Sequence, residues 1–239
     1  MPVSDQTPDA VAGSVPTGSW QLAPVVGRLR FYGGVMGQGK SALALQLAHH
    51  RRTAGRPGLL LTRDDRAGGG RLTSRLGIGA SASEFDATTD LRRMVVDALP
   101  PRGYVIVDEA QFLTEEQVDQ LAWAADEHAI DVDCFGLVTA FDSRLFPGSR
   151  RLIELADETI PLQVEVMCWC GAPGRVNSRI EHGAVARSGG QVAVGDLVAH
   201  TDVTYQVLCR RHWRDGDLGP HAGDVPLPLI PYPADFPTC

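Results

Sequence analysis

A glycine-rich loop at positions 34–41, Gly-Val-Met-Gly-Gln-Gly-Lys-Ser, has the pattern GxxxxGK[ST]. In such a loop, backbone N–H groups at the start of a helix bind the phosphates of a nucleoside triphosphate, a lysine reaches the outer phosphates and a hydroxyl binds magnesium. The alternative is a glycine-rich turn before an ordinary helix, but this loop follows a predicted strand and opens a predicted helix. The sequence therefore predicts ATP or GTP binding by Gly34, Val35, Met36, Gly37, Gln38, Gly39, Lys40 and Ser41.

Two adjacent carboxylates, Asp108 and Glu109, follow the apolar run Tyr104–Val107. A carboxylate at this place, where a strand reaches the phosphate-binding edge of a sheet, commonly organises magnesium, so we expect Asp108 and Ser41 to bind the Mg²⁺ that accompanies ATP. The alternative is that Asp108 caps a helix. Glu109 remains for chemistry: in a hydrolase it would polarise water, and in a kinase it would take the proton of an acceptor hydroxyl. Spacing alone does not separate these two roles.

Two close pairs of metal-binding side chains lie about forty residues apart, Cys168 with Cys170 and Cys209 with His212. Thiolate and imidazole ligands in a set of four suit tetrahedral zinc, which folds small modules that lack a core of their own. The alternative is that buried cysteines and a surface histidine cluster by chance. Because no spare ligand or nearby base suggests an open coordination position, we expect the Zn²⁺ to be structural.

The chain has 239 residues, of which 44% are hydrophobic and 21% charged, which fits one large domain or one domain with a small appendage. Its formal net charge of −7 argues against a broad nucleic-acid-binding surface, and Lys40 is its only lysine. No stretch approaches the roughly 18 apolar residues of a membrane span, and residues 1–19 do not resemble a signal peptide. We expect a cytoplasmic protein with no nucleic-acid and no membrane partner.

The segments that position these residues read as strands alternating with helices. Continuous apolar strands that alternate with helices indicate a parallel sheet covered on both faces. We therefore predict an α/β fold, a P-loop NTPase-like parallel sheet flanked by helices, with a small zinc-binding subdomain. The expected strands are 29–32, 59–61, 104–107, 132–138 and 159–166, and the expected helices are 40–53, 91–99, 115–128 and 152–156.

Composition divides the chain into four parts. Residues 1–27 carry scattered Pro, Gly, Ser and Thr and are expected to form a disordered arm. Residues 28–166 form the predicted P-loop domain, in which the Gly-, Arg- and Asp-rich stretch 62–86 is expected to be a long mobile loop. Residues 167–215 form the predicted zinc-binding subdomain, and the proline-rich residues 216–239 a disordered tail.

Several motifs between residues 29 and 213 occur together in one enzyme family. They are the phosphate loop with Met36 inside it, Asp-Glu-Ala-Gln-Phe at 108–112, Gly136-Leu137 through Phe141, the run from Phe146 to Asp157, Cys168-Trp-Cys-Gly171, and Tyr205 before Cys209-Arg-Arg-His212. In these motifs the chain resembles the compact thymidine kinases found in bacteria and in animal cytosol. The resemblance implies a P-loop domain with a zinc-binding lasso subdomain, and ATP and thymidine as substrates.

The resemblance also implies roles for single residues. Glu109 matches the catalytic base, which takes the proton from the 5′-hydroxyl of the deoxyribose. The resemblance further implies a homotetramer inhibited by the end product dTTP, in nucleoside salvage for DNA synthesis. Residues that match the thymidine-binding side chains are Met36, Phe112, Phe141 and Tyr205, and residues that match a D-x-R element near the phosphates are Asp64 and Arg66. Each apolar match has a plainer interpretation as core filler or as an ordinary strand residue.

Two other functions remain as alternatives. A P-loop ATPase of the helicase or motor kind also carries an apolar strand that ends in Asp-Glu-Ala, and DNA-stimulated ATP hydrolysis without a nucleoside would favour it. A zinc-containing nucleotide-binding regulator without catalysis would bind ATP saturably and phosphorylate no nucleoside. An intact Glu109 argues against the regulator, and the little room for a second coupling domain argues against the motor.

Overall fold

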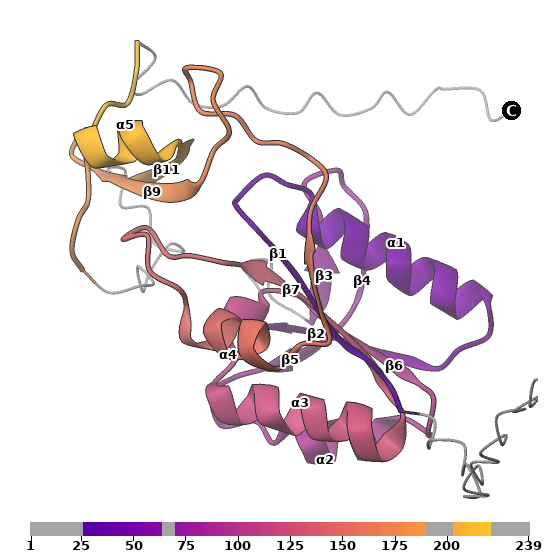
Figure 1. Cartoon of the computed structure of the whole chain (residues 1–239). Helices are drawn as coiled ribbons and strands as arrows, with labels where there is room; N and C mark the ends of the chain where they lie inside the picture. The colour runs from indigo at the N-terminus through magenta and orange to yellow at the C-terminus, as the bar shows by residue number, and fades with distance from the viewer. Residues whose placement is uncertain (1–25, 64–69, 190–202, 221–239) are drawn as a thin grey trace, which may run out of the picture.

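A six-stranded parallel sheet forms the centre of the computed structural model, which describes residues 26–63, 70–189 and 203–220 (Figure 1). The strand order is β5-β2-β6-β7-β1-β8, and every neighbouring pair runs parallel. The strands are β1 (Leu29–Gly34), β2 (Gly58–Arg63), β5 (Ser83–Phe85), β6 (Tyr104–Val107), β7 (Asp131–Leu137) and β8 (Glu158–Pro161). The predicted α/β class with a parallel sheet is confirmed.

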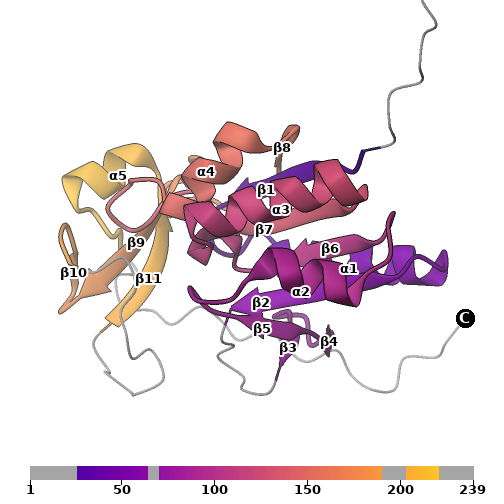
Figure 2. The same ribbon diagram turned by 90° about the horizontal axis from the view of Figure 1, so that it is seen from below.

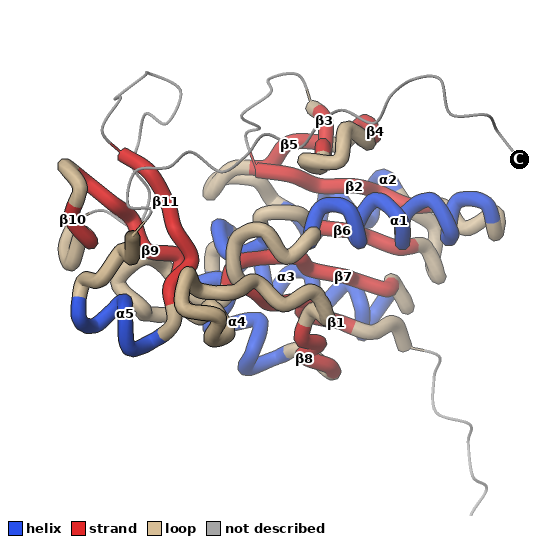
Figure 3. The backbone as a smooth tube through the Cα atoms, turned by 90° about the horizontal axis from the view of Figure 1, so that it is seen from above, coloured by secondary structure: helices blue, strands red, loops and turns tan. Residues whose placement is uncertain are grey.

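Helices cover both faces of this sheet, as Figures 2 and 3 show. Successive side chains of a strand point to opposite faces. In β6, Tyr104 and Ile106 pack beneath α1, whereas Val105 and Val107 join the larger core beneath the other helices. A strand buried on both sides needs the continuous apolar run that the sequence shows. The helices are α1 (Lys40–Thr53) on one face and α2 (Leu91–Ala98), α3 (Glu115–His128) and α4 (Pro147–Leu155) on the other.

Local signals explain where these helices begin. Thr114 and Gln117 form a capping box at the start of α3, in which the Thr114 hydroxyl accepts from the Gln117 N–H and the Gln117 side chain accepts from the Thr114 N–H. Asp90 caps α2 by accepting from the N–H of Arg93. Pro147 occupies the first turn of α4, where its missing N–H costs nothing.

The expectation of one long loop over residues 62–86 is wrong. Strand β2 continues to Arg63, β5 pairs with β2 at the edge of the sheet, and an antiparallel hairpin joins β3 (Arg71–Thr73) to β4 (Gly79–Ser81). Each of these three later strands has only three residues, so no alternation of apolar and polar side chains marks it in the sequence. Pairing with partners, not local pattern, creates them.

Two predicted boundaries are also wrong. The helix expected at 152–156 starts five residues earlier, at Pro147, and ends at Leu155. The strand expected at 159–166 is limited to Glu158–Pro161, because it pairs only with β1, up to Pro161. A proline has no N–H with which to continue a ladder of hydrogen bonds. The remaining predicted helices and strands agree with the structure to within one or two residues.

A small C-terminal subdomain lies beyond the carboxyl ends of the parallel strands (Figures 1 and 2). It consists of β9 (Val176–Glu181), β10 (Ala184–Val185), β11 (Val203–Leu208) and α5 (Arg210–Asp215), with the three strands paired in the order β10-β9-β11. Its own core is small: Leu208 and Leu218 pack with Cys168 and Cys209. Within the described residues no helix is long and apolar enough to cross a membrane.

Candidate active site and metal centre

The phosphate loop connects β1 to α1 and is shaped by its own hydrogen bonds. Gly39, the residue before the helix, has a φ of 77°, a left-handed conformation that glycine adopts without strain. The Val35 N–H donates to Gln38 Oε1 at 2.7 Å, and Lys40 Nζ donates to the Val35 carbonyl at 2.7 Å. Burial lowers the pKa of Lys40, although the charges of Glu109 and Asp108 act in the opposite direction. The loop, the lysine and both carboxylates therefore share one site.

Asp108 follows β6 directly and is buried, with a side-chain hydrogen bond to Ser41. Burial, followed by the neighbouring charge of Glu109, raises the pKa of Asp108 to about 6, and the bond from Ser41 opposes this rise. A carboxylate and a hydroxyl side by side at a phosphate loop are the hard oxygen ligands that Mg²⁺ prefers. The two residues predicted to bind magnesium thus lie together and fit the ion, while the binding itself stays a prediction.

Glu109 is held in an unusual backbone conformation, with a φ of 54°. A glutamate in the left-handed region costs free energy, so the surrounding contacts must hold it there. Gln111, which is 2% exposed, donates from Nε2 to Glu109 Oε2 and accepts the Leu137 N–H on Oε1 at 2.9 Å. Gln111 therefore aims the carboxylate of Glu109, a role that the sequence analysis did not assign. The role of Glu109 as a base stays a prediction.

Three of the four side chains predicted to surround a nucleoside are aromatic, and each lies near an arginine. Phe112 is half-buried, 5.8 Å from Phe146 in an edge-to-face arrangement, and lies under the guanidinium of Arg63 at 4.9 Å. The Arg179 guanidinium carbon lies 3.9 Å from the centre of the Phe141 ring. Tyr205 in β11 pairs with Arg179 in β9.

Met36, the fourth predicted nucleoside contact, lies inside the phosphate loop and is linked to the C-terminal subdomain. Its N–H donates to Oδ1 of Asn177 in β9 at 2.7 Å. Sequence reasoning missed Asn177 and Arg179, because a single polar residue in a short strand has no distinguishing pattern. Asp64 and Arg66, predicted near the phosphates, lie outside the described residues.

The four predicted metal ligands come together in the C-terminal subdomain. One ligand atom from each of Cys168, Cys170, Cys209 and His212 lies within 4.8 Å of the others, and Cys168 Sγ is 3.3 Å from His212 Nδ1. Tetrahedral zinc with Zn–S and Zn–N bonds of about 2.3 and 2.0 Å spaces its ligands by roughly 3.5 Å, so this donor set fits Zn²⁺. The four residues can hold a metal ion.

Two further residues surround His212. Asp217 Oδ2 lies 4.0 Å from His212 Nε2, the ring nitrogen that faces away from Cys168, and the Trp169 ring stacks on the imidazole at 4.3 Å. A carboxylate beside the second nitrogen of a metal-bound histidine orients the ring and keeps the other nitrogen available for the metal. Asp217 lies outside the predicted Cys/His pattern, and sequence reasoning missed it.

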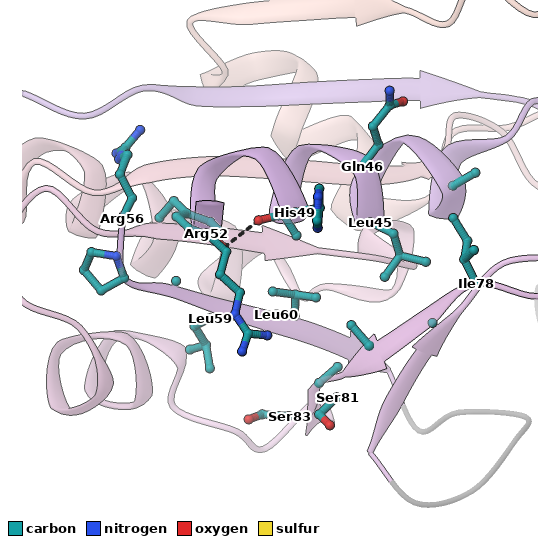
Figure 4. A pocket seen from close by; sticks show the side chains of 18 of the residues that line it. Leu45, Gln46, His49, Arg52, Arg56, Leu59, Leu60, Ile78, Ser81 and Ser83 are labelled. Carbon is teal, nitrogen blue, oxygen red and sulfur yellow. Dashed lines mark hydrogen bonds between the residues drawn. The ribbon is translucent and has the colours of Figure 1, made fainter. Parts of the chain in front are cut away.

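A cavity of about 1050 Å³ lies away from these groups, between α1, β2 and the β3–β4 hairpin (Figure 4). Leu45, Leu60 and Ile78 contribute apolar walls, and Arg52 and Arg56 lie at its edge. Its lining, taken over the described residues, includes no predicted site residue. Phosphates bind to a backbone loop at a helix N-terminus and need no deep cavity, so we place the chemistry at the loop and the two carboxylates.

Known proteins similar in sequence to this chain share one family. A sequence model of the family described as "Thymidine kinase" matches residues 27–213. The chain is 51% identical over 190 residues to a thymidine kinase of Streptomyces coelicolor, a match that covers 78% of this chain and 88% of that protein. It is 45% identical over 194 residues to a thymidine kinase of Cutibacterium acnes, covering 80% and 90%, and 42% identical over 193 residues to one of Novosphingobium aromaticivorans, covering 79% and 97%. The chain belongs to the thymidine kinase family.

Proposed function

We propose that this chain transfers the γ-phosphate of ATP to the 5′-hydroxyl of thymidine, giving thymidine 5′-monophosphate and ADP. The observation that carries the proposal is the placement of Glu109. Its carboxylate lies beside the proposed magnesium ligand Asp108, is oriented by Gln111, and is close enough to the phosphate-loop Lys40 to raise the pKa of that lysine. A base beside the proposed magnesium ligand and the phosphate-loop lysine would lie next to the terminal phosphate of bound ATP, where the acceptor hydroxyl attacks.

The proposed reaction forms one O–P bond and breaks another. The 5′-oxygen of thymidine attacks the γ-phosphorus, its proton passes to the Glu109 carboxylate, and the bond to the β,γ-bridging oxygen breaks to release ADP. Lys40 and the loop N–H groups stabilise the charge on the phosphate oxygens. Magnesium, held by Ser41 and Asp108, would neutralise further phosphate charge. Positioning and charge stabilisation are the main requirements of phosphoryl transfer, and this site supplies both.

The nucleoside would lie between the phosphate loop and the C-terminal subdomain. Aromatic and thioether side chains suit the faces of a flat base. We assign Met36, Phe112, Phe141 and Tyr205 to this contact, and Asp64 and Arg66 to the phosphates. The hydrogen bond between Met36 and Asn177 supports the assignment, because it brings the two walls of the proposed site together.

The remaining proposals rest on the family. The zinc at Cys168, Cys170, Cys209 and His212 would be structural, holding residues 167–215 as a lasso subdomain on the P-loop domain of residues 28–166. The enzyme would act in the cytoplasm as a homotetramer, with dTTP as feedback inhibitor.

A screen of labelled-phosphate transfer from [γ-³²P]ATP to each natural nucleoside, with Mg²⁺ present, tests the function. We expect label in thymidine monophosphate. ATP hydrolysis that needs DNA and no nucleoside would instead indicate a motor-type ATPase. Saturable ATP binding without transfer to any nucleoside would indicate a regulator.

A further inference from the structure

A buried amide, Asn177, joins three segments of the chain that are far apart in sequence. It is 3% exposed and lies in β9 of the C-terminal subdomain. Its Oδ1 accepts the Met36 N–H of the phosphate loop at 2.7 Å, and its Nδ2 donates to the Thr139 carbonyl, just after β7, at 3.3 Å. A buried amide that uses both its acceptor and its donor in this way holds its partners in one geometry.

The partner of Asn177, the Met36 N–H, belongs to the predicted phosphate loop. Backbone N–H groups of such a loop bind phosphate oxygens, so the orientation of each peptide decides nucleotide affinity. The adjacent Val35 N–H is already directed to Gln38 Oε1. Asn177 fixes the next peptide, and thereby the interior of the loop, from outside the P-loop domain.

The same strand also contacts the proposed nucleoside site. Side chains two residues apart on a strand share a face, so Asn177 and Arg179 lie on one side of β9 and Ser178 on the other. Arg179 is 4% exposed, lies 3.9 Å over the Phe141 ring and donates to the Ser188 carbonyl at 3.2 Å. One face of β9 thus contacts the phosphate loop through Asn177 and the predicted nucleoside contact Phe141 through Arg179.

The strand is anchored at the metal-binding end of the subdomain. Val176, the first residue of β9, pairs with Leu208, which immediately precedes the ligand Cys209 and packs against Cys168. Packed side chains and paired strands of this kind can carry a positional change from one site to another.

We propose that Asn177 is a positioning residue that couples the C-terminal subdomain to the phosphate loop, so that occupancy of the nucleoside site changes the affinity of the loop for nucleotide. Coupling of this kind is reciprocal, so nucleotide in the loop also favours nucleoside binding. This inference rests on the proposed function for the identity of the nucleoside.

Its test compares Asn177→Leu, which keeps a similar volume but removes both hydrogen bonds, with Ser178→Ala on the opposite face of the same strand. Ser178 is buried, and among the described residues its hydroxyl reaches only the Val176 carbonyl, at 3.5 Å. We expect Asn177→Leu to weaken binding of a fluorescent ADP analogue about tenfold, the cost of one lost hydrogen bond with a buried unpaired N–H. We expect Ser178→Ala to leave it unchanged.

Two further readouts separate positioning from general instability. Amide hydrogen exchange in the peptide that contains Met36 should accelerate in Asn177→Leu and not in Ser178→Ala. The KM for ATP should rise by the same factor as the dissociation constant of ADP, while the melting temperatures of the two variants show whether either has lost its fold. If leucine does not fit, Asn177→Ala removes the same two bonds without bulk and is compared in the same way.

The last arm measures how thymidine changes the affinity for the ADP analogue. Thymidine should tighten ADP binding in the wild-type protein and should do so less in Asn177→Leu. Loop exchange and ADP affinity equal to those of Ser178→Ala would overturn the proposal. Failure of the proposed function looks different: the wild-type protein would neither phosphorylate thymidine nor respond to it, yet ADP affinity and loop exchange would still report on Asn177.

Discussion

Neighbouring residues fix the conformation of Glu109. Its left-handed backbone conformation is unfavourable for a glutamate, and the buried Gln111 holds its carboxylate while being fixed in turn by the Leu137 N–H. Such an arrangement gives a base one orientation before substrate arrives, which reduces the cost of reaching the reactive geometry.

Glu109→Gln should lower the turnover number at least about a hundredfold, because the amide keeps the shape of the side chain but does not take a proton. The affinity for ADP should stay close to that of the wild-type protein, since the loop and Lys40 are untouched. Steady-state kinetics and ADP titration measure the two effects. Glu116→Gln, a change of the same kind at an exposed position on α3, is the control. Near-normal turnover in Glu109→Gln would falsify the assignment of the base.

Asp108 should make the stability of the ligand-free protein depend on pH. The pKa of Asp108 is about 6 in the folded chain against 3.8 for an ordinary aspartate, so the folded state binds a proton more tightly than the unfolded state. The free energy of unfolding should therefore decrease as the pH rises from about 4 to about 6, by at most about 3 kcal/mol. Below this window the contribution of the protonated group is fully present.

Denaturant unfolding of the metal- and nucleotide-free protein across this pH range measures the effect. Asp108→Asn cannot ionise, so its curve of stability against pH should lack this component. Mg²⁺ should reduce the pH dependence of the wild-type protein, because a bound cation favours the carboxylate. If the free energies of unfolding of the wild-type protein and Asp108→Asn differ by the same amount at every pH, the pKa of Asp108 is not raised in the folded chain.

At the scale of elements, the start of α3 supports the site. The capping box of Thr114 and Gln117 begins two residues after Phe112, and the Gln117 amide also donates to the carbonyls of Asp86 and Thr89 at 2.6 and 3.0 Å. The start of α3 thus holds two segments in place. One carries Glu109 and Phe112, and the other is the turn before α2. This explains why the residue at the first buried turn of α3 is a polar glutamine.

Thr114→Ala should destabilise the protein by about 1 kcal/mol, the usual cost of losing an N-cap. Thr114→Ser keeps the hydroxyl and should restore most of that stability. Denaturant unfolding of both variants gives the two values. Equal loss in the alanine and serine variants would mean that the methyl group, and not the cap, contributes the stability.

At the scale of the whole molecule, we propose that the C-terminal subdomain depends on its four candidate metal ligands. Its described core consists of a few side chains around Cys168 and Cys209, too few to offset the entropy of ordering the segment without further support. Four side chains that can reach one ion would supply that support with zinc bound.

Cys168→Ser should lose zinc and lower the melting temperature by about 10 °C, since a structural zinc site contributes its binding free energy to folding. Metal analysis and thermal unfolding measure the two effects on the same sample. Cys239→Ser, which changes a cysteine that is not one of the four predicted ligands, should change neither. Full zinc content in Cys168→Ser would remove the cysteine from the ligand set.

Features that depend on contiguous residues can be predicted from the amino-acid sequence alone. A phosphate loop consists of one strand end, one turn and one helix start, so its pattern is local, and the same holds for the carboxylates that follow β6. The helices at 40–53 and 115–128 were predicted at their observed bounds, because their apolar spacing and their start and stop signals are local too. The cysteine and histidine pairs predicted the metal cluster for a similar reason.

Contacts between residues far apart in the sequence are known only from the folded structure. Met36 and Asn177 are 141 positions apart, and no sequence pattern in either segment predicts their hydrogen bond. The contact between Arg179 and Phe141 and the pairing of β3 with β4 have the same origin. Single polar side chains and three-residue strands acquire their role from partners that the fold brings close. Local propensity is short-ranged, whereas burial and pairing are properties of the folded chain.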